Sequence, residues 1–162
     1  MNWASFVRTT IVVLILIVLH YTLRPLLAWR TEIDFLLIAL VFSAVRMRPA
    51  AGAVFGFLLG IAADSLELGA FGSGALAATV VGFSASYMKA VFFADNLALN
   101  GFFLFLGKWV FDLVYVLMER RMGGTELLMQ LIVWSPLSAA VTAVAGVIAI
   151  TVLRPILEVR SA

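Results

Sequence analysis

Cysteine is absent from this chain of 162 residues, and histidine occurs once. The chain therefore has no disulfide framework, no thiolate nucleophile and no cysteine metal site. Charged residues are scarce, at 12% of the chain against roughly 25% in soluble domains. Hydrophobic residues make up 64%, which is material for several membrane helices of about 20 residues each. This balance excludes a soluble globular protein, a disordered chain and a nucleic-acid-binding domain.

Apolar runs separated by charged or glycine-containing segments predict an all-α polytopic membrane protein, a compact bundle of six transmembrane helices. The whole chain, 1–162, is expected to form a single integral membrane domain. The predicted spans are 5–23, 33–45, 50–63, 71–93, 97–118 and 127–153. The second and third are short for a hydrocarbon core of about 30 Å, so an arrangement of five spans stays open.

Helix boundaries are indicated by proline and by capping residues. Pro49 can stop one helix and start the next, after the turn 46–48. Asp95-Asn96 predicts the N-cap of the fifth span. Ser135-Pro136 interrupts the last apolar run, where Ser135 is expected to cap a fresh helix. Residues 126–134 would then form an interfacial or kinked segment.

The distribution of basic residues favours cytoplasmic N- and C-termini. With six spans, both termini lie on one side of the membrane. The side of the termini then carries Arg8, Arg46, Arg48, Lys89, Arg154 and Arg160. The opposite side carries Arg24, Arg30, Arg120 and Arg121. The excess of positive charge on the first side predicts that this side faces the cytoplasm.

A ladder of glycines ends in an aspartate. Gly52, Gly56 and Gly60 are spaced four residues apart, and Asp64 follows at the same interval. In a helix this spacing puts three bare backbone patches and one carboxylate on one stripe. Lipid gives no hydrophobic drive for helix association, so close approach needs small residues at the contact. The ladder is therefore expected to pack against a second helix of this chain or to seat a helix of another protein.

The next helix carries a second stripe of small residues. Its members are again spaced four apart: Gly74, Ala78, Gly82 and Ser86. Two small-residue stripes on consecutive helices predict that the two helices pack closely together. The chain also continues after the ladder with Leu68-Gly69 and Gly74-Ala75-Leu76.

The segment 56–64, GFLLGIAAD, together with Leu68-Gly69 and Gly74-Ala75-Leu76, resembles the bacterial rod shape-determining protein MreD family. The motif resemblance covers about residues 49–83, and the rest agrees in length and hydropathy. The resemblance implies a non-catalytic subunit of the cell-elongation machinery in the bacterial inner membrane. It also implies a fold similar to the S components of energy-coupling-factor vitamin transporters.

The same resemblance implies partners. An MreC-like single-span protein with a periplasmic domain is the direct one. Through it the chain would connect MreB filaments with the peptidoglycan polymerase RodA and its class B penicillin-binding protein. Membrane lipid surrounds the bundle, a homodimer stays open, and neither a nucleic acid nor a cofactor is expected.

Charged side chains within the apolar spans need partners, because each costs about 2.5–3.5 kcal/mol on insertion scales. Lys108 and Asp112 lie four residues apart in the fifth span and are expected to pair. The alternative is that Lys108 reaches Asp64 across helices. Asp64 itself is expected either to accept hydrogen bonds from the following loop or to anchor helices together. His20, the only histidine, is expected at the interfacial end of the first span.

Other functions are less well supported by these residues. A vitamin-binding transporter subunit, the runner-up, needs several convergent polar groups, and Lys108, Asp112, Asn100 and His20 are few. A proton-coupled carrier would show an inverted repeat, which is not apparent. An enzyme is not expected, because the chain offers no nucleophile paired with a base and no set of metal ligands.

Overall fold

Helices form all the regular structure in the computed structural model, which describes residues 3–23, 33–66, 71–88, 96–119 and 124–157. Along these residues the chain forms six helical segments, the last of which is continuous through three assignments. They are α1 (Trp3–Leu23), α2 (Phe35–Ala44), α3 (Pro49–Asp64), α4 (Ser73–Tyr87), α6 (Leu97–Glu119) and α7 (Gly124–Met129) continued by η1 (Gln130–Trp134) and α8 (Ser135–Leu157). The predicted all-helical bundle is confirmed.

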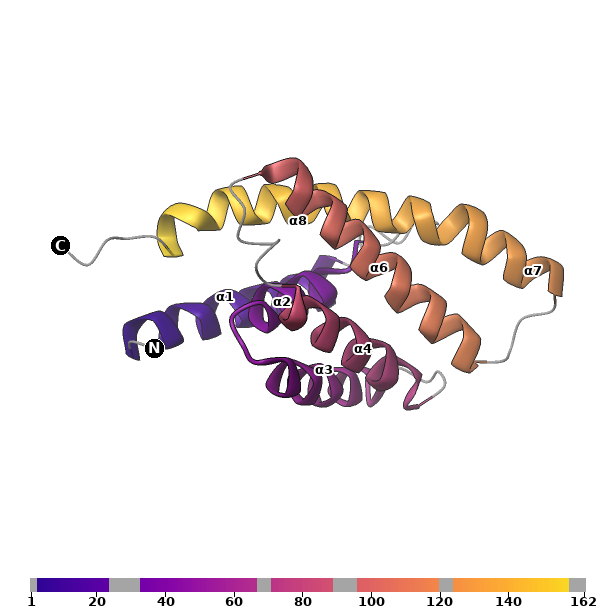
Figure 1. Cartoon of the computed structure of the whole chain (residues 1–162), viewed down its shortest axis with the longest axis horizontal. Coiled ribbons are helices and arrows are strands. Elements are labelled where there is room, and N and C mark those ends of the chain that lie inside the picture. Colours follow the sequence, from indigo (N-terminus) through magenta and orange to yellow (C-terminus); the bar gives the residue numbers. More distant parts are fainter. Residues whose placement is uncertain (1–2, 24–32, 67–70, 89–95, 120–123, 158–162) are drawn as a thin grey trace.

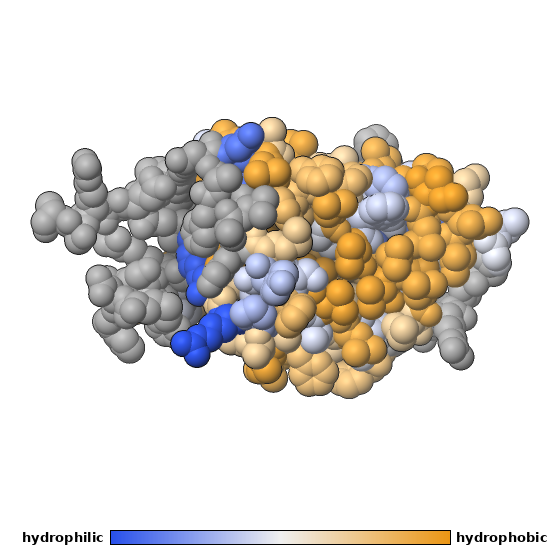
Figure 2. Space-filling model, viewed as in Figure 1, coloured by the Kyte–Doolittle hydropathy of each residue, from blue (hydrophilic) through white to orange (hydrophobic). Residues whose placement is uncertain are grey.

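Among the described residues, two helices are long and apolar enough to cross a membrane, Leu97–Met118 and Gly124–Val152. Shorter apolar helices cover Thr10–Thr22, Phe35–Ala44 and Pro49–Asp64. Figure 2 shows that apolar side chains cover most of the described surface in this view, with the strongly hydrophilic ones gathered towards one end. Such a surface suits a bilayer, whose hydrocarbon contacts the outer faces of the helices.

The short helix α2 lies at the centre of the bundle. All ten of its residues are buried, as expected for a helix that is apolar on every side. It contacts α1, α3, α4, α6 and α8. In Figure 1, α6 lies between α8 on one side and the α3–α4 pair on the other. The neighbours of α2 thus shield it, which explains how a helix of ten residues persists at the core.

Local residue chemistry sets several helix starts. Asp34 caps α2, with its Oδ1 accepting from the Leu37 amide at 3.0 Å. Pro49 begins α3, where no amide donor is needed. Asn96 Oδ1 accepts from the amides of Ala98 and Leu99 at 3.0 and 3.3 Å, so it caps α6 as predicted. Asp95, the other half of that predicted cap, lies outside the described residues.

The last helix differs from the prediction at Pro136. Ser135 does not cap a fresh helix, because the helix continues from 124 to 157 through the π-helical turn η1. The Ser135 amide donates to the Gln130 carbonyl, five residues back. A proline clashes with the carbonyl four residues before it, and a widened turn relieves that clash. The segment 126–134 is thus a distorted part of one long helix.

Candidate functional site

The two small-residue stripes face each other across the α3–α4 contact. Gly52, Gly56 and Gly60 are buried on α3, and Gly74, Ala78 and Gly82 are buried on α4. A Cβ atom added at Gly60 would lie 2.5 Å from Ala75 Cα. One added at Gly52 would lie 2.6 Å from the Gly82 carbonyl oxygen. Both distances are below any normal carbon contact, so the helices can approach this closely only because the side chains are missing.

This geometry confirms the predicted close packing of the two stripes. It also decides between the two uses considered for the ladder. The backbone of α4 lies directly against Gly52, Gly56 and Gly60, and no space along that face remains for a helix of another protein. The ladder is therefore used for packing within this chain.

Asp64 ends the ladder and orders the start of the next helix. Its Oδ2 accepts hydrogen bonds from the amides of Gly72 at 2.8 Å and Ala75 at 3.1 Å. Gly72 has a φ of 99°, a conformation that glycine adopts without strain. A Cβ atom at Gly74 would collide with the Asp64 carboxylate. Asp64 is thus an acceptor that joins α3 to the start of α4, while Gly69 lies outside the described residues.

A second polar centre lies among α1, α2, α6 and α8. Lys108 Nζ is 2.6 Å from Asp112 Oδ1, so the predicted pair along α6 is present. The same ammonium is 3.1 Å from Asp34 Oδ2, and the alternative pairing of Lys108 with Asp64 is wrong. The lysine is buried and lies between two carboxylates, which compensates its removal from water.

Asp34 connects this cluster to two more helices. Its backbone amide donates to the Thr142 hydroxyl of α8 at 3.2 Å. His20 Nδ1 of α1 lies 3.7 Å from Asp34 Oδ1. His20 lies in the last turn of α1, at the expected end of the helix, and is only 8% exposed. We call Asp34, Lys108, Asp112 and His20 the charge cluster.

Sequence reasoning missed Asp34 as a partner of Lys108. The two residues are 74 positions apart, and no local pattern connects them. The available hint was that an aspartate directly before a fully apolar run caps a helix whose whole surface must be buried. Within the cluster, the Lys108 ammonium is paired with two carboxylates. Within the described part of the chain, no group of three or more His, Cys, Asp or Glu residues could hold a metal.

The fold and these two centres define a class: a small, all-helical membrane protein held together by glycine packing and by internal ion pairs. The family model for the rod shape-determining protein MreD matches residues 2–159. The chain therefore belongs to the MreD family, whose role is in rod shape determination. No curated protein and no solved structure matches the chain.

Proposed function

We propose that this protein is a non-catalytic subunit of the bacterial cell-elongation complex in the inner membrane. It binds the single span of an MreC-like protein and so helps regulate peptidoglycan synthesis by RodA and its class B penicillin-binding protein. The family match over residues 2–159 carries this proposal. The start of α1 and the end of α8 lie at the same end of the molecule (Figure 1), which supports two termini on the same side of the membrane.

The polar groups described above favour a scaffold function, because they bind other residues inside the bundle. Lys108 is paired with two carboxylates, and Asp64 holds the start of α4. A transporter subunit would direct such groups into a cavity that a polar solute can enter. Here they fix helix positions, which is what a platform for another protein's helix requires.

The partner's span then binds an outward apolar face. We favour the outer face of α1, where four large side chains are at least half exposed: Ile11, Leu14, Ile15 and Val18. This helix packs mainly on α2 and α8, and His20 connects it to the charge cluster. A partner seated on α1 would therefore hold a fixed position relative to the whole bundle.

Affinity purification of the tagged chain from detergent-solubilised native membranes tests the proposal. We expect one single-span protein with a periplasmic domain to co-elute. Val18→Trp should reduce its recovery about tenfold, a loss of about 1.4 kcal/mol. The matched control is Leu58→Trp on α3, because Val18 and Leu58 are 63% and 60% exposed. Co-elution of an ATPase pair with a membrane coupling subunit would contradict the proposal and favour a transporter.

A further inference from the structure

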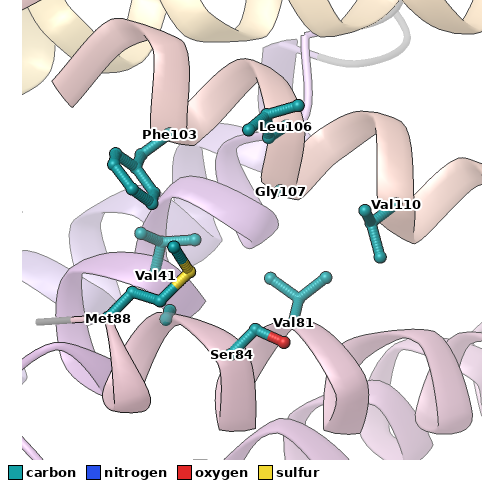
Figure 3. A pocket seen from close by; sticks show the side chains of 9 residues that line it. Val41, Val81, Ser84, Met88, Phe103, Leu106, Gly107 and Val110 are labelled. Atoms are coloured by element: carbon teal, nitrogen blue, oxygen red, sulfur yellow. The ribbon is translucent and has the colours of Figure 1, made fainter. Parts of the chain in front are cut away.

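A cavity of about 240 Å³ lies between α4 and α6, with Val41 of α2 behind it. Its walls are hydrocarbon and thioether, apart from the hydroxyl of Ser84. Figure 3 shows Met88 and Phe103 at one end and Val81 and Val110 at the other. Met88 and Val110 are 41% and 36% exposed, so the cavity opens on the outer, apolar side of the bundle.

Gly107 makes this cavity by a different means from the glycines of α3. A Cβ atom at Gly107 would lie 3.8 Å from Val81 Cγ1 and 3.9 Å from Val41 Cγ2, which is ordinary contact. Helix packing therefore does not demand a glycine here. The missing side chain leaves a space in the wall of α6, at the turn that also carries Lys108.

The shape of the cavity restricts what can fill it. It extends along α4 from Val81 to Met88, about 10 Å at 1.5 Å per residue. Apolar side chains line it along this length and Ser84 supplies the single hydroxyl, which suits an extended hydrocarbon chain. Apolar cavities of about 150 Å³ stay dry and bind hydrocarbon ligands, so water does not fill this one.

We propose that this cavity, the α4–α6 slot, binds one acyl chain of a membrane phospholipid. The bilayer supplies acyl chains at the level of the slot. Chain methylenes restore the dispersion contacts that an empty slot would lose. The lipid completes the packing between α4 and α6, whose helices touch beyond the slot.

Photolabelling of the full chain tests this site. The protein is reconstituted in vesicles of phosphatidylethanolamine and phosphatidylglycerol with a trace of phosphatidylethanolamine that carries an acyl-chain diazirine. We expect labelling of segments 81–88 and 103–110 about tenfold above the exposed α3 segment 54–58. That ratio corresponds to about 1.4 kcal/mol of preference. Equal labelling of all outward helix faces would overturn the proposal.

Variants that fill the slot make the test specific. Gly107→Leu should lower labelling of both segments about tenfold, because its side chain enters the space now open. Val110→Phe fills the slot from its exposed rim and should act in the same direction if Gly107→Leu does not fold. Ala140→Leu, on an exposed position of α8, adds a leucine side chain away from the slot and should leave labelling unchanged. Unchanged labelling in both slot variants would contradict lipid occupancy. A loss of labelling when a co-purified partner is present would also contradict it, because the partner would then fill the slot.

Discussion

Backbones make the contact between α3 and α4, whereas an ion pair of charged side chains joins the N-cap of α2 to α6. At the first contact, Gly52, Gly56 and Gly60 let the helices approach until a single added carbon would collide. At the second, Lys108 lies between Asp34 and Asp112. Both solve the problem that lipid gives no hydrophobic drive for helix association.

The two contacts should respond differently to substitution. A glycine contact fails by overlap, and no neighbouring change short of moving a helix can relieve it. An ion pair fails when one partner is lost, but replacing all its members with apolar groups can be neutral or stabilising. The stability of the glycine contact thus depends on steric fit, and the stability of the charge cluster depends on charge compensation.

The largest effect is expected for Lys108→Met. The substitution leaves two buried carboxylates without their cation. Breaking a buried ion pair in this way costs about 3–5 kcal/mol of unfolding free energy. Chemical unfolding in detergent micelles, followed by circular dichroism, measures the loss. Arg48→Met, which removes an exposed cation from the turn before α3, is the control and should change the unfolding free energy by less than about 0.5 kcal/mol.

Removing the two carboxylates as well should restore the stability of the lysine variant. When Asp34→Leu and Asp112→Leu are added to Lys108→Met, none of the three charges of the Lys108 ion pairs remains. We expect recovery of most of the unfolding free energy lost in the single variant. A triple variant that is less stable than Lys108→Met would show that the cluster acts through more than charge compensation.

Gly56→Leu should follow, with a loss of about 3 kcal/mol from overpacking. Its Cβ would overlap the Ala78 carbonyl of α4, so the two helices must separate. Leu58→Ile on the same helix is the control, because Leu58 is exposed to the bilayer. The same unfolding assay checks both, and a stable Gly56→Leu variant would contradict the close contact.

A smaller effect is expected at Asp64. Asp64→Ala removes the acceptor of two backbone amides and should cost about 1–2 kcal/mol, as for a lost helix cap. Asp64→Asn keeps a side-chain carbonyl oxygen and should retain most of that stability. Equal losses in the two variants would mean that the charge, and not the hydrogen bonding, matters at the start of α4.

The smallest effect is expected for Gly107→Ala. Since a Cβ at this position meets only ordinary contacts, the unfolding free energy should not fall and should rise by up to about 1 kcal/mol, because alanine is a better helix former than glycine. A loss as large as that of Gly56→Leu would mean that Gly107, like Gly56, is required for close helix packing. The variant therefore separates a glycine required by packing from one that opens a cavity.

The sequence predicted what depends on local spacing. The α3–α4 contact follows from glycines four residues apart on consecutive helices, and the Lys108–Asp112 pair follows from one helical turn. Contacts between distant segments could not be found in this way. Asp34 and Lys108 meet only because α2 is buried between its neighbours, and no spacing encodes that. The position of His20 at the end of the first span could be predicted, but the burial of its side of the helix could not.

The central claim is that the buried charges hold distant helices of this bundle to each other, leaving apolar outer faces for lipid and partner. A double-mutant cycle between Asp34→Asn and Lys108→Met tests it directly, by measuring unfolding free energies of both single variants and the double variant. The contact at 3.1 Å predicts a coupling energy of about 0.5–3 kcal/mol. Additive losses, within about 0.3–0.5 kcal/mol, would show that the two residues do not interact and would contradict the claim.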